Sequence, residues 1–251
     1  MKIIAGPCQH ESLEQSLEIA EECSRVCEMY DMDYYFKASF DKANRSHVNG
    51  ERGVGLIKTM QDFAEISFDY YILTDVHDEA QIDIVKHYVD VIQIPAFLSR
   101  QTDLIQAACD TRCTVNIKKG QFMAPWDIKN VLSKTHGDVW ITERGATHGY
   151  NNLVVDFTGM QFMLDNYNVP IVFDATHSVQ RPGLLGESSG GNRDYVPGLT
   201  RAAAAMGVQN FFLEVYPDPD NAPSDAANTL YLDDFERVIR DIHRYSYSGE
   251  I

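Results

Sequence analysis

Residues 34–46 read YYFKASFDKANRS, and the order of apolar and polar residues in this stretch indicates the fold. The run Tyr34–Phe36 is short, continuous and apolar, which is typical of a strand buried on both faces of a parallel sheet. Lys37, Lys42 and Arg45 follow within nine residues. Lysine offers a movable point charge and arginine a planar fork, and both bind phosphate and carboxylate groups. A buried strand that ends in these cations therefore predicts a phosphorylated ligand at its carboxyl end.

Apolar runs of the same kind recur along the chain. We expect eight strands, at Lys2–Ala5, Tyr34–Ser39, Tyr70–Val76, Val89–Ala96, Thr114–Lys118, Val139–Glu143, Val169–Ala175 and Phe211–Val215. Amphipathic segments between and after them are expected as helices, at Leu13–Met29, Gly55–Ile66, Glu79–Tyr88, Thr102–Thr111, Pro125–Thr135, Asp156–Tyr167, Val196–Met206 and Leu232–Arg244. Ser12 is a candidate N-cap, and Pro125 suits the first turn of a helix. Strict alternation predicts a parallel sheet, and eight such units in 251 residues predict an α/β fold, the (β/α)8 TIM barrel.

The domain organisation follows from what separates these segments. A doubly wound open sheet is the structural alternative, but no G-x-G-x-x-G follows the first predicted strand. No linker rich in Ser, Gly or Pro divides the chain, so residues 1–251 are expected to form a single domain. The longest irregular stretch, residues 178–194 (SVQRPGLLGESSGGNRD), predicts a mobile lid over the active site.

The charge balance narrows the kind of ligand. A formal net charge of −16 argues against nucleic-acid and anionic-membrane partners, because both require a broad basic face. Nine of the twenty-one Lys and Arg residues lie at or just after predicted strand ends: Lys37, Lys42, Arg45, Arg52, Arg100, Lys118, Lys119, Arg144 and Arg193. Positive charge that is concentrated locally in an acidic protein favours a small anionic ligand.

The cysteines and the apolar segments indicate the compartment. Five cysteines are an odd number without a C-x-x-C pair, which favours neither a disulfide framework nor a zinc ribbon. Cys23 and Cys27 have helical spacing and are expected to pack as small apolar residues. Ile3–Ala5 is too short for a signal sequence, and no apolar run reaches the length of a membrane-spanning helix. We therefore expect a reducing, cytoplasmic location.

Two groups of side chains are expected to converge where the barrel strands end, because the active sites of such barrels form at that face. The cationic group comprises Lys37, Lys42, Lys118 and Arg144, with Arg45 and Arg100 further out. The second group comprises Cys8, His177, Glu214 and Asp225. The first, seventh and eighth strands are neighbours in a closed barrel, which brings residues 8, 177 and 214 together. A thiolate, an imidazole and two carboxylates suit Fe(II), Mn(II), Zn(II) or Co(II).

Each of these residues also has a simpler explanation when taken alone. A single cysteine near a first strand is more often a small buried residue, and a single histidine is more often part of a hydrogen-bonded structure. Glu214 and Asp225 can be charges on the rim of the barrel, and Lys118-Lys119 can be a solvated pair. The functional interpretation rests on the conjunction of polar residues at all eight predicted strand ends.

Five segments carry a resemblance to a known family. They are residues 37–46 (KASFDKANRS), 94–103 (IPAFLSRQTD), 116–122 (NIKKGQF), 174–180 (DATHSVQ), and 143–145 (ERG) followed by 149–156 (GYNNLVVD). The chain closely resembles the 3-deoxy-D-manno-octulosonate 8-phosphate synthase family over nearly its whole length. This resemblance implies a homotetrameric (β/α)8 transferase of lipopolysaccharide sugar biosynthesis. Such an enzyme condenses phosphoenolpyruvate with D-arabinose 5-phosphate and water, and releases the eight-carbon sugar acid phosphate and inorganic phosphate.

The resemblance also implies roles for individual residues. Phosphoenolpyruvate contacts are implied for Lys37, Lys42, Lys118, Gln121 and Arg144. Arabinose 5-phosphate contacts are implied for Asn44, Arg45, Ser46 and Asp75, for Arg100 toward a neighbouring subunit, and for the lid residues Ser189 and Arg193. Ser39 is implied as a further substrate contact. The residues implied in catalysis are Lys37, Lys42, Asn44, Asp75, Lys118 and His177. Cys8, His177, Glu214 and Asp225 match the metal-dependent group of the family, as does Gly120, whereas Tyr216 stands where the family pattern has histidine.

Other functions remain open at this point. A sister synthase could use phosphoenolpyruvate with another aldose, such as erythrose 4-phosphate or an N-acyl hexosamine. A non-catalytic barrel could bind or sense sugar phosphates without turnover. A metal-storage or scaffold protein is the third alternative, and it leaves the cationic group unexplained.

Overall fold

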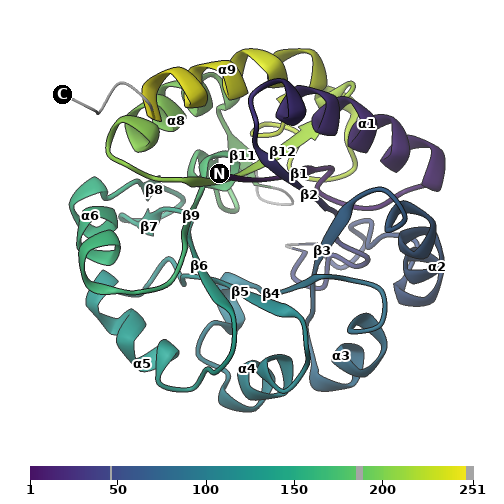
Figure 1. Ribbon diagram of the computed structural model, residues 1–251, viewed down its shortest axis with the longest axis horizontal. Helices are drawn as coiled ribbons and strands as arrows, with labels where there is room; N and C mark the ends of the chain where they lie inside the picture. Colours follow the sequence, from purple (N-terminus) through teal and green to yellow (C-terminus); the bar gives the residue numbers. More distant parts are fainter. Residues whose placement is uncertain (46, 185–188, 247–251) are drawn as a thin grey trace.

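The computed structural model describes residues 1–45, 47–184 and 189–246, which form a closed barrel of parallel strands (Figure 1). The barrel strands are β1 (Lys2–Gly6), β2 (Asp33–Lys37), β3 (Tyr71–Asp75), β4 (Val91–Ile94), β5 (Thr114–Lys118), β6 (Val139–Glu143), β9 (Ile171–Asp174) and β12 (Asn210–Tyr216). They pair in this order, and β1 also pairs with β12, which closes the ring. The eight predicted strands and the TIM barrel are therefore confirmed, and the closing pair excludes the open-sheet alternative.

Helices follow the strands and surround the barrel, as Figure 1 shows. The α-helices on this outer ring are α1 (Leu13–Met29), α2 (Leu56–Ile66), α3 (Glu79–Val85), α4 (Thr102–Cys109), α5 (Ile128–Leu132), α6 (Phe157–Asn166), α8 (Val196–Ala205) and α9 (Phe235–Ser246). Short 3-10 turns lie at η1 (Ala96–Leu98), η2 (Pro125–Asp127), η3 (Arg193–Tyr195), η4 (Pro219–Asn221) and η5 (Leu232–Asp234). Ser12 caps α1 by accepting a hydrogen bond from the backbone N–H of Gln15, and Pro125 opens η2, as expected. Helices α3 and α5 end earlier than predicted, because residues 86–88 and 133–134 form turns.

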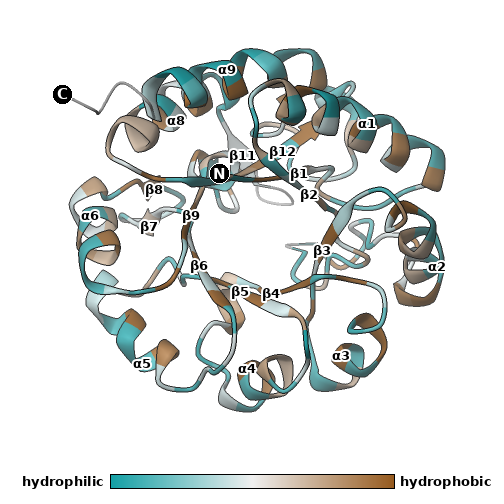
Figure 2. Cartoon of the chain, in the orientation of Figure 1, coloured by the Kyte–Doolittle hydropathy of each residue, from teal (hydrophilic) through white to brown (hydrophobic). Residues whose placement is uncertain are grey.

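Apolar side chains fill both sides of the barrel wall. A continuous core lies between strands and helices, with Phe36, Phe173 and Phe211 among its buried residues. A second cluster fills the barrel interior and comprises Ile4, Leu73, Val91, Trp140, Val172 and Phe212. Figure 2 shows this distribution, with hydrophobic residues along the strands and mixed faces on the helices. The filled interior makes the barrel a packed core rather than a pore, and function is confined to its ends.

The loops at the carboxyl ends of the strands contain further short elements. Helix α7 (Ala175–Ser178) follows β9 directly, and β13 (Leu230–Tyr231) pairs with the end of β12. A small hairpin pairs β7 (Ala146–Thr147) with β8 (Leu153–Val154). A second one pairs β10 (Gln180–Arg181) with β11 (Gly190–Gly191), so the predicted irregular stretch 178–194 contains regular structure. Residues 185–188 of that stretch lie outside the described part, and its role as a lid stays a prediction.

The cysteines and helices also bear on the expected compartment. All five cysteines are buried free thiols, and Cys23 and Cys27 pack in the core as expected. None of the described helices combines the length and apolar character needed to cross a bilayer.

Gly6 makes a close approach that the site depends on, because it stands just before Pro7-Cys8 at the end of β1. A Cβ atom at Gly6 would lie 2.1 Å from the carbonyl oxygen of Lys37 on the neighbouring strand β2. We expect Gly6→Ala to lower the free energy of unfolding by about 3 kcal/mol in urea titrations, because overpacking forces the backbone to shift.

Gly198 provides the matched control. It lies in α8, and the nearest atom to a Cβ placed there is 4.0 Å away. Gly198→Ala is expected to leave the free energy of unfolding unchanged or to raise it by up to about 1 kcal/mol, since alanine favours helices. Equal stability of the two variants would contradict the close approach at Gly6.

Candidate active site

Closure of the barrel places one group of donor side chains at the carboxyl ends of β1, β9 and β12. Gly6 pairs with Glu214 in the closing register, so the Cys8 loop begins beside this carboxylate. The ligand atoms of Cys8, Glu214 and Asp225 lie within 4.8 Å of one another. Nε2 of His177 lies 3.5 Å from Oε1 of Glu214 and 3.7 Å from Oδ2 of Asp225. The structure thus brings together the four residues proposed from the sequence, and we call them the donor cluster.

Glu214 provides a test of whether the donor cluster suits a metal. Its side chain is fully buried, and neither carboxylate oxygen has a hydrogen-bond partner among the described residues. The ammonium of Lys37 lies 3.5 Å from Oε1, which is an ion pair without a hydrogen bond. Buried carboxylate oxygens without hydrogen bonds are costly unless a cation or donor satisfies them. A divalent metal ion fits this position and this set of ligand types.

Cys8 lies in the same environment. Its Sγ lies 3.3 Å from Oδ2 of Asp225 and donates a hydrogen bond to it. Burial, and next the negative charge of Glu214, raise the pKa of the Cys8 thiol well above its ordinary value. Without a cation the residue is therefore a neutral thiol, and metal binding releases its proton.

Asp174 orients His177 within the donor cluster. It ends β9 and caps α7, where its Oδ1 accepts a hydrogen bond from the backbone N–H of His177 at 2.9 Å. Its Oδ2 lies 2.7 Å from Nδ1 of the same histidine. An Nδ1–H that donates to a carboxylate leaves the lone pair on Nε2, so Nε2 and the carboxylates of Glu214 and Asp225 all offer lone pairs that suit a cation between them.

Asp174 also holds the first member of the cationic group. Nζ of Lys118 lies 2.6 Å from Oδ2 of Asp174, and both side chains are buried. Burial would raise the pKa of Asp174, but the charges of His177 and Lys118 outweigh it and keep the pKa well below its usual range. Burial lowers the pKa of Lys118 despite Asp174, and the nearby Lys37 and Arg144 lower it further. One carboxylate therefore serves both groups of side chains.

Lys37 and Lys118 flank one aromatic ring at the barrel centre. Their ammonium groups lie 5.6 and 4.0 Å from the ring centroid of Phe212. Cations over an aromatic face are stabilised by its quadrupole. The ring thus helps to keep two like charges close together in a buried place. The electrostatic attraction between these charges and a multiply charged anion is stronger there than at an exposed surface.

Ser39, which follows β2, connects two lysines to Asp75. Its hydroxyl accepts hydrogen bonds from Nζ of Lys37 at 3.0 Å and Nζ of Lys42 at 2.9 Å, and donates to Asp75. Burial opposes the charged form of Asp75, but His77 and the two lysines hold the pKa of Asp75 well below its usual range. Lys42 is half-buried and lies next to Lys37, so the structure brings it together with the cationic group.

Arg144 contacts the donor cluster through a glutamine. Nη2 of Arg144 donates to Oε1 of Gln180 at 2.8 Å, and Nε2 of Gln180 donates to Oδ1 of Asp225 at 2.9 Å. Burial lowers the pKa of the Arg144 guanidinium. Gln121, three residues after Lys118, is also buried, and its Oε1 has no hydrogen-bond partner among the described residues.

Other predicted residues lie further from this centre. Arg45 donates hydrogen bonds to Glu51, Gln9, Pro223 and Ser224, so protein groups already engage its guanidinium. Arg193 forms an ion pair with Asp220 at 2.7 Å and lies over the ring of Tyr231. Asn44 and Arg100 are exposed, and the hydroxyl of Ser189 accepts a hydrogen bond from the N–H of Gly183. Ser46 lies outside the described residues.

One interpretation from the sequence is wrong. Lys118-Lys119 is not a solvated pair, because both side chains are buried. Nζ of Lys119 lies 3.2 Å from Oε2 of Glu143 and donates to the carbonyl of Met123. The two lysines point into different environments because neighbouring residues of a strand face opposite sides.

The sequence analysis missed two residues of the site. Asp174 was passed over, although an aspartate three residues before His177 has the spacing of a helix N-cap. Gln180 stands in the quoted segment 174–180, but its role was not assigned, because its two partners are 36 and 45 residues away. The departure at Tyr216 has a local explanation, since its hydroxyl donates to Glu11 and accepts from Gln15 at the start of α1.

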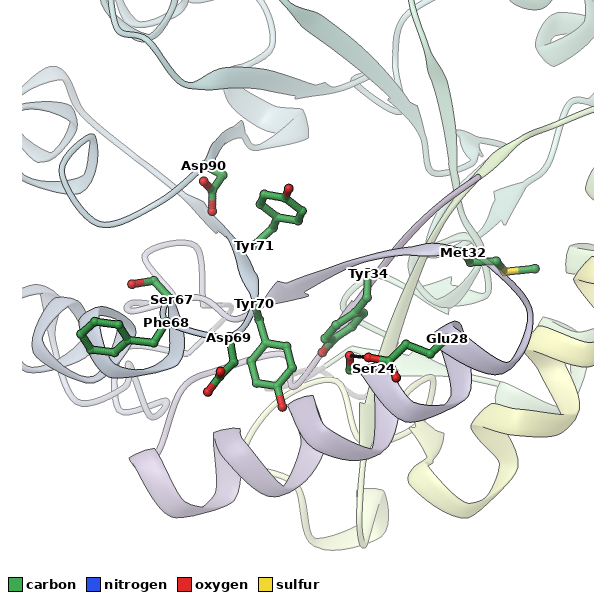
Figure 3. A pocket seen from close by; sticks show the side chains of 10 residues that line it. All are labelled: Ser24, Glu28, Met32, Tyr34, Ser67, Phe68, Asp69, Tyr70, Tyr71 and Asp90. Atoms are coloured by element: carbon green, nitrogen blue, oxygen red, sulfur yellow. Dashed lines mark hydrogen bonds between the residues drawn. The ribbon is translucent and has the colours of Figure 1, made fainter.

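A hollow of about 420 Å³ lies away from this site, near the N-terminal ends of β2 and β3 (Figure 3). Three tyrosines and the carboxylates of Glu28, Asp69 and Asp90 contribute to its wall. The described lining contains no lysine or arginine. An acidic wall repels phosphate and carboxylate groups, which argues against this hollow as a site for a phosphorylated anion.

A TIM barrel with buried lysines and an arginine beside a Cys-His-Glu-Asp group has the features of an enzyme that acts on phosphorylated anions. The chain belongs to the DAHP synthetase I family, whose sequence model matches residues 1–245.

Curated relatives narrow the similarity within this family. The 2-dehydro-3-deoxyphosphooctonate aldolase of Rickettsia bellii (strain OSU 85-389) is 51% identical over 249 residues, 97% of this chain and 90% of the relative. The proteins of the same name from Nitrobacter hamburgensis and Rhizobium meliloti are 50% identical over 246 residues and 49% identical over 248 residues. These matches cover 96% of this chain and 86% and 88% of the relatives. That name is a synonym of 3-deoxy-D-manno-octulosonate 8-phosphate synthase, so the resemblance inferred from the motifs is confirmed.

Asp174→Asn tests the shared carboxylate. The substitution keeps the shape but leaves the Lys118 ammonium buried without its counter-charge. We expect the free energy of unfolding to fall by about 3–5 kcal/mol in urea titrations. Asp165→Asn on the exposed face of α6 is the matched control and should stay within about 0.5 kcal/mol. A loss of similar size in both variants would argue against a role for Asp174 in holding Lys118.

Proposed function

We propose that this protein is a metal-dependent 3-deoxy-D-manno-octulosonate 8-phosphate synthase. It condenses phosphoenolpyruvate with D-arabinose 5-phosphate and water, and releases inorganic phosphate. The observation that carries this proposal is the contact between buried cations and the donor cluster at one end of the barrel, with Lys37 beside Glu214 and Lys118 beside the Asp174–His177 pair. The activity named for relatives that are about 50% identical supports it.

The buried cations bind phosphoenolpyruvate. Its carboxylate and phosphate together require several positive groups, and Lys37, Lys42, Lys118 and Arg144 supply them, with Gln121 as a further hydrogen-bonding group. Because these cations are desolvated, their attraction for the anion is stronger than at an exposed surface. Asp174, Ser39 and Gln180 together hold all four of these cations before the substrate arrives, which reduces the cost of organising the site.

The residues after β2 and β3 bind arabinose 5-phosphate. Ser39, Asn44 and Asp75 contact its hydroxyl groups and aldehyde, while Arg45 and Ser46 contact its phosphate. Arg45 exchanges some of its present protein partners for the phosphate. Arg100 is exposed after η1 and reaches the sugar phosphate of a neighbouring subunit in a homotetramer, and Ser189 and Arg193 close over the phosphate from the lid.

Cys8, His177, Glu214 and Asp225 hold a divalent metal ion, which can be Fe(II), Mn(II), Zn(II) or Co(II). When bound, the ion supplies a positive charge that orients and polarises the sugar aldehyde or a water molecule. His177 presents Nε2 to it because Asp174 holds Nδ1–H. The five free thiols suit a reducing compartment, and we propose a cytoplasmic location.

The bond changes follow from the charges that the chain provides. The cations neutralise the repulsion between two anionic substrates and hold the enol carbon of phosphoenolpyruvate against the aldehyde carbon. A carbon–carbon bond forms, the aldehyde oxygen takes a proton, and positive character develops at the enolpyruvate carbon. Water adds there and gives up one proton, the carbon–oxygen bond to the phosphate then breaks, and the added hydroxyl passes its remaining proton to the departing phosphate as it becomes the ketone. Lys37, Lys42, Lys118, Asn44, Asp75 and His177 are the residues that we propose to act in these steps.

Incubation with both substrates tests the reaction. We expect phosphate release with stoichiometric formation of the eight-carbon sugar acid phosphate, and loss of at least about 90% of the rate after treatment with a strong chelator, restored by added metal. Erythrose 4-phosphate and N-acetylmannosamine should be turned over at least about a hundredfold more slowly. Preference for another aldose would indicate a sister synthase, and binding without turnover would indicate a non-catalytic barrel.

Cys8→Asn tests the thiolate ligand. Co(II) bound to the unchanged protein should show a thiolate-to-metal charge-transfer band in the near ultraviolet, because the Cys8 sulfur is part of the donor set. The variant should lose this band and bind Co(II) at least about tenfold more weakly, while keeping some metal-free turnover. Cys109→Ser is the matched control, since this cysteine lies at the end of α4. Retention of the band in Cys8→Asn would exclude Cys8 as a ligand.

A further inference from the structure

Gln180 joins the two halves of the site with a single side chain. Its Oε1 accepts a hydrogen bond from Arg144 of the cationic group at 2.8 Å. Its Nε2 donates to Oδ1 of Asp225 of the donor cluster at 2.9 Å. Arginine can only donate and an ionised carboxylate can only accept, so one orientation of the amide satisfies both partners. The orientation of Gln180 is therefore fixed by Arg144 and Asp225 together.

The fold holds Gln180 in place from the backbone side. It is the first residue of β10, where it pairs with Gly191 of β11. A Cβ atom at Gly191 would lie 3.0 Å from Cβ of Asn228, so this strand packs closely against the segment that carries Asp225. The β10–β11 hairpin, the loop of Asp225 and the end of β6 thus meet at one amide group.

Asp225 is held by a tight local turn that makes its side chain sensitive to this contact. Its φ of 51° lies in the left-handed region, which is uncommon for residues other than glycine. Its carbonyl accepts hydrogen bonds from the backbone N–H groups of Asn228 and Thr229 and from the Thr229 hydroxyl. The backbone is therefore fixed, and the direction of the carboxylate depends on Cys8, on His177 and on the Gln180 amide.

The other connection between the two groups differs in kind. Asp174 links Lys118 to His177 through an ion pair with the lysine and a contact with Nδ1 of the histidine, and removal of its own charge changes the net charge of the site. Gln180 is neutral and contacts neither the other cations nor Glu214 by any hydrogen bond found among the described residues. A neutral substitution at Gln180 therefore removes the hydrogen-bonded link between the cationic group and the donor cluster without changing the net charge that attracts the substrate.

We propose that Gln180 is a positioning residue that couples occupancy of the donor cluster to anion binding at Arg144. This inference rests on the proposed function. A cation held by Asp225 fixes the carboxylate, the carboxylate fixes the amide, and the amide aims the guanidinium at the anion. By linkage, the anion strengthens cation binding by the same factor.

The experiment measures this factor directly in the full-length chain. The dissociation constant of phosphoenolpyruvate is determined by calorimetry with and without saturating Mn(II), and that of Mn(II) with and without phosphoenolpyruvate. For each ligand, we divide its dissociation constant without the other ligand by its dissociation constant with the other ligand present. We expect this ratio to be about ten for both ligands in the unchanged protein. In Gln180→Met, which retains the length of the side chain without the amide, the ratio should fall to about threefold or less, the remainder being direct electrostatic attraction between the two ligands.

Two further variants make the result specific. Gln180→Glu keeps an acceptor for Arg144 but cannot donate to ionised Asp225, so its ratio should also fall to about threefold, even though it adds a negative charge. Gln161→Met, on the exposed face of α6, should keep the ratio of the unchanged protein. Circular dichroism and thermal unfolding establish that each variant is folded.

The outcomes distinguish the inference from the proposed function. An unchanged protein that does not bind phosphoenolpyruvate contradicts the proposed function, and the inference with it. An unchanged protein that binds with a ratio near one, or a Gln180→Met variant that keeps the ratio within a factor of about two, overturns the inference alone. Loss of folding in both Gln180 variants would assign the residue a purely structural role and overturn it as well.

Discussion

The pairing of β1 with β12 is the constraint on which the site depends. It sets Gly6 opposite Glu214, and the chain can leave β1 so close to β2 only because residue 6 has no side chain. Two residues further on, Cys8 reaches the carboxylate of Asp225. The hydrogen bonds of one strand pair thereby fix the distance between ligand atoms that come from opposite ends of the sequence. The chemistry is a consequence of ring closure as much as of residue type.

The electrostatics of the site rest on shared partners rather than on isolated pairs. Asp174 serves Lys118 and His177, and Ser39 serves two lysines and Asp75. Asp174 and Ser39 therefore each position more than one polar group of the site, and the side chains of the site are held at fixed distances from one another. Glu214 is the exception, because its oxygens lack hydrogen bonds in the described structure, and it stands where the donor cluster needs a cation.

The sequence predicted the fold and the convergence of the donor cluster for identifiable reasons. Strands buried on both faces, such as Tyr34–Phe36, are continuous apolar runs, and the polar residues after them had to meet at one end of a closed barrel. Properties that depend on distant partners could not be predicted in this way. The burial of Lys119 against Glu143, the engagement of Arg45 by Ser224 and the position of Gln180 are set by loops that pack across the barrel end. No local pattern encodes those contacts.

The separation of Cys8 from Asp225 by 217 positions has a consequence for how the protein is made. A chain emerging from the ribosome carries Cys8 long before Asp225, so the two cannot meet until 217 further residues have been made. Contacts of such high sequence separation form late and slow folding. Until then the growing polypeptide cannot assemble the donor cluster, because its members come from segments that have not yet been joined.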